Sequence, residues 1–129
     1  MSKKIVIQGI VSSGLAEAFD FTQLAWVKEQ CLERLGFVPY PGTLNLKVEG
    51  EYLNAIKELR EQEGIEIIPP TPDFCKAISY RTSIKEIDAA VVIPLVKDYP
   101  EDIIEIIAPI KLKEALSIKD GDRLMISIG

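Results

Sequence analysis

The segment Pro39-Tyr40-Pro41-Gly42-Thr43-Leu44-Asn45-Leu46-Lys47-Val48 combines a turn motif with a strict alternation of polar and apolar residues. Proline fixes φ and glycine accepts positive φ, so the Pro-Gly pair predicts a turn. In a strand over residues 43–48, the apolar side chains point to one face, and those of Thr43, Asn45 and Lys47 point to the other. The segment therefore predicts a half-buried strand that begins directly after a tight bend.

Similar β-rich segments occur along the rest of the chain. Strands are predicted over residues 5–11, 74–80, 87–94, 103–108 and 123–128, with a loop over the proline-rich residues 67–73. Helices are predicted over 24–35, where Gly36 can cap the end, over 52–62 and over 111–116. Because most strands lack a helical connector, the pattern indicates a mainly β fold, a small closed barrel of about six strands, and not a parallel α/β sheet.

The size and composition of the chain predict one ordinary folded domain. Its 129 residues leave no room for a second core, and 47% hydrophobic with 27% charged residues is typical of a water-soluble protein. The apolar runs fall short of the ~20 residues that a membrane helix needs. The apolar run that follows the first few residues is too brief for a signal peptide, so we expect no membrane partner and a cytoplasmic location.

Charge and residue content exclude several classes of function. A net charge of −5 repels nucleic-acid phosphates, so no nucleic-acid partner is expected and any phosphate site must be local. The chain has no histidine, which rules out a Ser-His-Asp triad and a Cys-His pair. It also lacks a cysteine pair at zinc-binding spacing, so both Cys31 and Cys75 are expected to be small buried hydrophobic residues.

Four features are candidates for chemistry. Thr43 and Asn45 project from the same strand face and offer oxygen ligands that suit Mg²⁺; the alternative is that both face solvent beside the turn. The small-residue segment 12–19 is either an anion-binding loop or a surface loop. Glu105, inside an apolar strand, either faces water or binds the N–H groups of a ligand. Lys111 and Lys113 supply positive charge for a phosphate, or are ordinary surface lysines.

Taken together, these segments resemble the archaeal CTP-dependent riboflavin kinases over almost the whole chain. The matching segments are Ser13-Gly14-Leu15 with Glu17, Leu35-Gly36-Phe37 to Pro39-Tyr40, Gly42-Thr43-Leu44-Asn45-Leu46, Ile104-Glu105-Ile106-Ile107-Ala108-Pro109 and Lys111-Leu112. The Gly42–Leu46 segment and the Ile104–Pro109 segment are the most specific of these.

The resemblance implies a six-stranded cradle-loop barrel, related to the swapped-hairpin (RIFT) folds, that spans residues 1–129. It also implies an enzyme that transfers the terminal phosphoryl group of CTP to the 5′-hydroxyl of riboflavin, giving FMN and CDP. The expected small-molecule partners are thus CTP or CDP and riboflavin or FMN, and the expected cofactor is Mg²⁺.

The resemblance also implies roles for individual residues. Thr43 and Asn45 would bind Mg²⁺, and the positions of Lys97 and Glu105 would bind the flavin. The nucleotide would be bound by two segments, Gly14, Leu15, Ala16, Glu17, Ala18 and Phe19, and Ile110, Lys111, Leu112 and Lys113. No catalytic base is assigned, since a loose phosphoryl-transfer transition state asks little of one.

This chain departs from the family pattern at several positions. Ala16 and Ala18 replace glycines of the nucleotide loop, and Lys97 and Tyr99 stand where the family has a threonine and a histidine. The alternative function is therefore a non-catalytic flavin- or nucleotide-binding module with a degenerate phosphate loop. A swapped-hairpin DNA-binding protein is a third class, which the acidic balance and the lack of a basic stripe disfavour.

Overall fold

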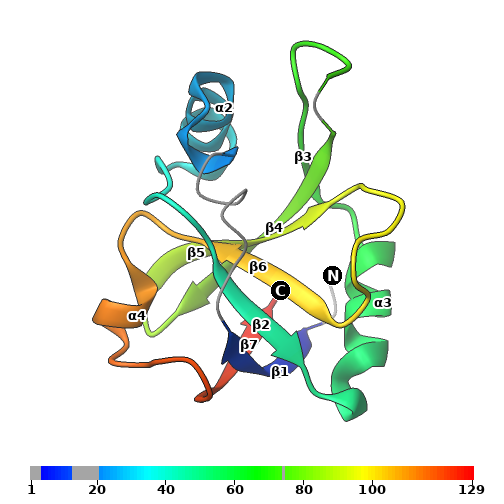
Figure 1. Ribbon diagram of the computed structural model, residues 1–129, viewed down its shortest axis with the longest axis vertical. Helices are drawn as coiled ribbons and strands as arrows, with labels where there is room; N and C mark the ends of the chain where they lie inside the picture. The colour runs from blue at the N-terminus through cyan, green and yellow to red at the C-terminus, as the bar shows by residue number, and fades with distance from the viewer. Residues whose placement is uncertain (1–3, 13–20, 74) are drawn as a thin grey trace.

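Seven strands form one antiparallel sheet in the computed structural model, which describes residues 4–12, 21–73 and 75–129 (Figure 1). The strands are β1 (Ile5–Ser12), β2 (Leu44–Val48), β3 (Ile65–Ile67), β4 (Ala77–Ile84), β5 (Ile87–Pro94), β6 (Ile103–Ile107) and β7 (Arg123–Ile128). Their order is β3-β4-β5-β6-β2-β1-β7, and β4 also pairs with β7 between Thr82 and Ile128. Six strands therefore close into a barrel, and β3 is an additional strand beside β4.

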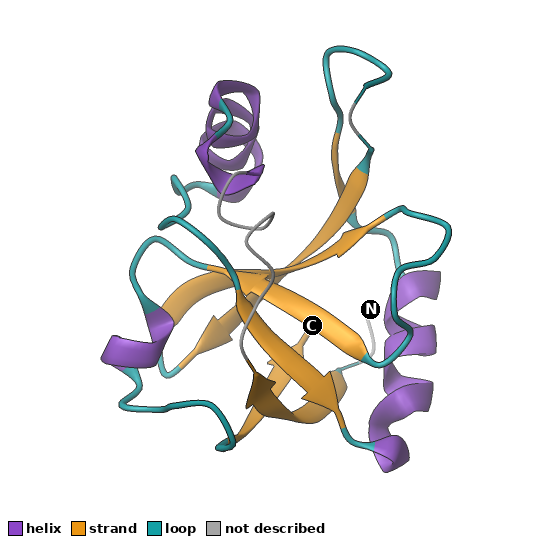
Figure 2. Cartoon of the chain, in the orientation of Figure 1, coloured by secondary structure: helices purple, strands orange, loops and turns teal. Residues whose placement is uncertain are grey.

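Short helices surround this barrel (Figure 2). They are α2 (Ala25–Leu35), the 3-10 helix η1 (Gly50–Tyr52), α3 (Leu53–Glu61) and α4 (Leu112–Ala115). The prediction of a mainly β fold with short helices and a closed six-stranded barrel is confirmed. Within the described residues, no helix has the length and apolar character needed to cross a membrane.

Apolar side chains are buried on both sides of part of the sheet. Alternate residues from all six barrel strands fill the interior, among them Ile7, Leu46 and Ile104. On the outer face, α2 packs against β4, β5 and β6 in a second cluster, which consists of Val27, Cys31, Leu35, Phe37, Ile67, Ala77, Ala90, Val92 and Ile107. Burial on both faces explains why β5 is an almost unbroken apolar run.

Helix α2 confirms the helix predicted over residues 24–35. Val27, Cys31 and Leu35 are its buried residues, and Gly36, at φ 85°, ends it with N–H bonds to the carbonyls of Cys31 and Leu32. Leu32, by contrast, is 56% exposed. It follows Cys31 directly, which turns it about 100° around the helix and away from the packed face.

One loop, one strand and one cysteine prediction need correction. Strand β3 begins before the predicted loop over 67–73, and the strand predicted over 74–80 runs instead from Ala77 to Ile84 and forms a hairpin with β5. Its turn uses Lys85 and Glu86, both at positive φ, where glycine or asparagine is the usual signal. Cys31 is buried as expected, but Cys75 is exposed, because it lies in the connection before β4 and not within a strand.

Candidate functional site

The ends of strands β1 and β2 meet the middle of β6 on the outer face of the barrel. Asn45 of β2 is paired with Ser12, the last residue of β1, and with Glu105 of β6. Both flanking residues of Asn45 lie in the barrel interior, and so do those of Glu105. Alternation therefore places the Asn45 and Glu105 side chains together outside the barrel.

Four side chains at this place form a hydrogen-bonded group, which we call the Glu105 network. The Thr43 hydroxyl donates to Glu105 Oε1 at 3.0 Å and lies 3.4 Å from Asn45 Oδ1. The Tyr99 hydroxyl donates to Glu105 Oε2 at 2.6 Å. Asn45 is only 6% exposed, so the alternative in which it simply faces solvent does not describe it.

The bend before β2 fixes the position of Thr43. Gly42 has a φ of 91°, which confirms the need for glycine at this turn. Its N–H donates to the buried Thr22 Oγ1 at 2.7 Å, and the N–H of Tyr40 donates to the carbonyl of Ala108 at 2.7 Å. The bend is thus attached both to the segment before α2 and to the end of β6.

The two oxygens predicted to bind a metal fit Mg²⁺ in kind and spacing. Neighbouring ligands in an octahedral Mg²⁺ site lie about 3 Å apart, since each stands 2.0–2.1 Å from the ion. Thr43 Oγ1 and Asn45 Oδ1, at 3.4 Å, need to approach by only a few tenths of an ångström. Both are neutral, so nucleotide phosphates would have to supply most of the negative charge. Among the described residues, no cluster of three or more His, Cys, Asp or Glu offers another metal site.

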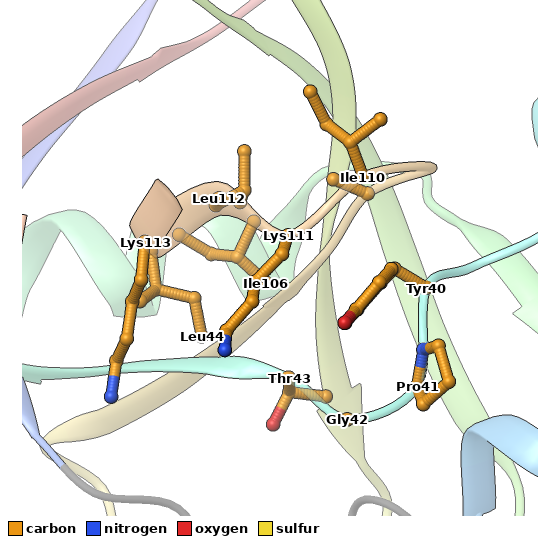
Figure 3. A pocket seen from close by; sticks show the side chains of 11 residues that line it. Tyr40, Pro41, Gly42, Thr43, Leu44, Ile106, Ile110, Lys111, Leu112 and Lys113 are labelled. Carbon is orange, nitrogen blue, oxygen red and sulfur yellow. The ribbon is translucent and has the colours of Figure 1, made fainter. Parts of the chain in front are cut away.

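A pocket of about 160 Å³ lies on one side of Thr43, and we call it the cationic pocket (Figure 3). Its lining comprises Tyr40, Pro41, Gly42, Thr43, Leu44, Ile106, Ala108, Ile110, Lys111, Leu112 and Lys113. It brings together all four residues of the predicted nucleotide segment 110–113. Figure 3 shows the Lys111 and Lys113 side chains extending toward the start of β2.

Both lysines of the cationic pocket have acidic neighbours. Lys113 Nζ lies 2.8 Å from Asp120 Oδ1, and Lys111 Nζ lies 3.7 Å from Glu114 Oε1. All four side chains are substantially exposed, and such ion pairs contribute at most about 1 kcal/mol. A phosphate group can therefore replace the carboxylates at little cost.

A second pocket, of about 410 Å³, lies on the other side of Thr43, and we call it the apolar pocket. It is lined by Phe21, Thr43, Cys75, Ala77, Val92, Pro94, Val96, Asp98, Tyr99, Pro100, Glu105 and Ile107. Its volume falls in the range of small-molecule sites, which combine apolar walls with a few polar groups. Thr43 lines both pockets, so ligands in the two pockets would both contact this residue.

The two predicted flavin-binding positions lie differently with respect to the apolar pocket. Glu105 lines it, whereas Lys97 is exposed and lies between two residues that line it, Val96 and Asp98. Tyr99 also lines the pocket, and its pKa is raised by burial first, then by its hydrogen bond to Glu105 and by the charge of that carboxylate. The phenol therefore stays protonated and remains a hydrogen-bond donor.

The predicted nucleotide residues Gly14, Leu15, Ala16, Glu17, Ala18 and Phe19 lie outside the described residues. The described residues on either side of them are both at the site. Ser12 pairs with Asn45, and Thr22 accepts the Gly42 N–H. These two described residues therefore contact Asn45 and the bend before β2.

Comparison with known proteins places the chain in a family. A family model named CTP-dep_RFKase, described as "Domain of unknown function DUF120", matches residues 11–128. The chain belongs to the CTP-dependent riboflavin kinase family. A protein of Archaeoglobus fulgidus named riboflavin kinase is 39% identical over 127 residues, which cover 96% of this chain and 54% of that protein. One of the same name from Pyrobaculum aerophilum is 38% identical, with 93% and 59% covered. The chain spans little more than half the length of these relatives.

Several lining residues of this family member were not predicted as site residues from the sequence. Tyr99 was noted only as a departure from the family, and Phe21 and Val92 were not singled out. Val92 belongs to an apolar strand in which core and pocket residues look alike. The cluster of a tyrosine with two prolines in residues 94–100 is the one signal that marks this connection as more than a surface loop.

Proposed function

We propose that this chain is a riboflavin kinase that transfers the terminal phosphoryl group of CTP to the 5′-hydroxyl of riboflavin, giving FMN and CDP. The observation that carries this proposal is the position of Thr43 between a cationic pocket and an apolar pocket. A phosphate donor suits the first, and a large flat acceptor suits the second. The family and the names of the relatives support the choice of CTP and riboflavin.

The cationic pocket would hold the nucleotide. Lys111 and Lys113 would contact its phosphates, together with backbone groups of residues 14–19, and Ile110 and Leu112 would pack beside them. Thr43 and Asn45 would hold Mg²⁺, which when bound neutralises phosphate charge. Phosphoryl transfer depends mainly on such positioning and on electrostatic stabilisation of the transition state.

The apolar pocket would hold the acceptor. Its walls, from Phe21 to Val92 and Ile107, suit the isoalloxazine ring, and the Glu105 carboxylate would accept hydrogen bonds from the flavin. Glu105 Oε1 lies 3.0 Å from the Thr43 hydroxyl. A flavin held by Glu105 would therefore place its 5′-hydroxyl end near the phosphoryl donor. Lys97 would contact the flavin only at the exposed rim.

The test incubates the chain with riboflavin, Mg²⁺ and either CTP or ATP. Conversion of riboflavin to FMN is then followed by chromatography. We expect FMN with CTP, a lower rate with ATP and none without a divalent ion. Riboflavin binding without any FMN would contradict the proposal and favour the non-catalytic binding module. A chain in which Thr43 and Asn45 are both replaced by alanine serves as the control for background conversion.

A further inference from the structure

The Glu105 carboxylate is held from both ends by protein hydroxyl groups. Its Oε2 accepts a hydrogen bond from Tyr99 at 2.6 Å, and its Oε1 accepts one from Thr43 at 3.0 Å. Hydrogen bonds to a carboxylate are stronger than those between neutral groups. The orientation of Glu105 therefore depends on the connection between β5 and β6, which carries Tyr99.

This arrangement determines how Thr43 presents its oxygen. A hydroxyl has one hydrogen and two lone pairs. Because the hydrogen of Thr43 is directed at Glu105, both lone pairs remain for other partners. The Glu105 carboxylate, as a negative hydrogen-bond acceptor, also makes the Thr43 oxygen a better metal ligand. Groups that accept a hydrogen bond from a metal ligand commonly have this effect.

Tyr99 has the properties needed to fix the carboxylate. It is half-buried in the apolar pocket, and its raised pKa keeps the phenol a donor. It does not line the cationic pocket, and its side-chain hydrogen bond connects it to Thr43 through Glu105. Glu105 is also the pairing partner of Asn45, the second predicted ligand.

We propose that Tyr99 is a positioning residue for the divalent-ion site, which holds Glu105 so that Glu105 in turn orients the Thr43 hydroxyl. This inference rests on the ion-binding roles of Thr43 and Asn45 in the proposed function. It assigns to a residue of the acceptor pocket a role in the binding of the ion and nucleotide in the other pocket.

The test measures ion binding and not turnover. Mn²⁺ is titrated into the protein in the presence of CDP, and the bound ion is followed by water-proton relaxation. Tyr99→Phe removes only the hydroxyl, and we expect it to weaken Mn²⁺ binding about tenfold, the lower end of the effect of residues behind metal ligands. Tyr52→Phe is the matched control, because Tyr52 packs on the barrel core away from both pockets. Wild-type affinity in Tyr99→Phe, or an equal loss in Tyr52→Phe, would overturn the proposal.

A double-variant cycle tests whether Tyr99 acts through Glu105. Glu105→Gln should weaken Mn²⁺ binding at least as much as Tyr99→Phe, and adding Tyr99→Phe to it should cause no further loss. Unchanged affinity in Glu105→Gln, or losses that add in the double variant, would each overturn the proposed route. The Glu105→Gln result stands even if Tyr99→Phe fails to fold.

Failure of this inference can be told apart from failure of the proposed function. Formation of FMN by the wild-type chain, with no effect of Tyr99→Phe on Mn²⁺ binding, would overturn the inference alone. Weakened Mn²⁺ binding in Tyr99→Phe, with no FMN from the wild-type chain, would overturn the kinase proposal alone. A wild-type chain that binds no Mn²⁺ with CDP would overturn both.

Discussion

Thr43 lines both pockets, so removal of its hydroxyl should affect turnover more than folding. Thr43→Val keeps the shape of the side chain, and we expect it to lower kcat for FMN formation on the order of 100-fold. Thr43→Ser keeps the hydroxyl and should stay within a few-fold of wild type. Steady-state kinetics would check this, and equal activity in Thr43→Val would remove Thr43 from the ion site.

The charge of Lys111 should matter for the nucleotide and not for the flavin. Lys111 lines the cationic pocket, and its exposed ion pair with Glu114 is weak. Lys111→Met should raise KM for CTP about tenfold, as expected for one lost phosphate contact of about 1.4 kcal/mol, and leave KM for riboflavin unchanged. Lys57→Met, an exposed position on α3, is the control. An equal rise in both KM values would contradict a phosphate-binding role.

The two cysteines should differ in reactivity. Cys31 is 1% exposed, and burial raises the pKa of its thiol to about 11, whereas Cys75 is exposed and lines the apolar pocket. At pH 8 one thiol of the folded chain should react with an aromatic disulfide reagent, because the thiolate is the reactive form. The Cys31 thiolate should form only as the pH rises toward 11.

Riboflavin should protect Cys75 in the same assay if the flavin occupies the apolar pocket. The measurement is the rate of colour release with and without riboflavin. Two thiols that react at equal rates would contradict the difference in burial. An unprotected Cys75 at saturating riboflavin would place the flavin elsewhere.

At the scale of residues, the sequence predicted the relative positions of side chains where the alternation of a single strand determines them. Alternation after the Pro-Gly bend placed Thr43 and Asn45 near each other without knowledge of the fold. Glu105 had two open alternatives, and only the pairing of β6 with β2 and β5 shows that it lies at a pocket. Tyr99 reaches Glu105 from a connection, whose path no periodicity describes.

At the scale of elements, α2 covers the outer face of the sheet through one row of side chains. Leu35→Ala should lower the free energy of unfolding by 2–5 kcal/mol, the usual range for a buried leucine, since Leu35 is 5% exposed. Leu32→Ala should change it by less than about 0.5 kcal/mol, because Leu32 is 56% exposed. Urea unfolding of both variants is the measurement, and similar losses would contradict the observed packing of the helix.

Elements with strong local signals were predicted well, and those fixed by tertiary contacts were not. The helix over 24–35 has both its periodic face and its glycine cap in the sequence. Strand β3 has only three residues and forms because all of them pair with β4. The strand before the β4–β5 turn was predicted to end too early, at residue 80, because Lys85 and Glu86 carry no turn signal although both adopt positive φ.

At the scale of the whole molecule, the barrel brings together parts of the chain that are far apart in sequence. Strand β2 pairs with β1 and β6, and β6 pairs with β5. The bend before β2, strand β6 with Glu105 and the β5–β6 connection with Tyr99 therefore become neighbours. The absence of helical connectors predicted a barrel, but not this pairing order. The order depends on which long-range pairs bury the most apolar surface, and no short segment contains that information.

The central claim is that donor and acceptor meet at Thr43, and the distance from the ion to the flavin tests it most directly. With Mn²⁺ and CDP bound, paramagnetic relaxation of bound riboflavin can be measured for each proton of the flavin. The account predicts the strongest relaxation at the 5′-CH₂OH group and the weakest at the methyl groups of the ring. Strongest relaxation at the ring methyl groups, or none anywhere while all three ligands are bound, would contradict it.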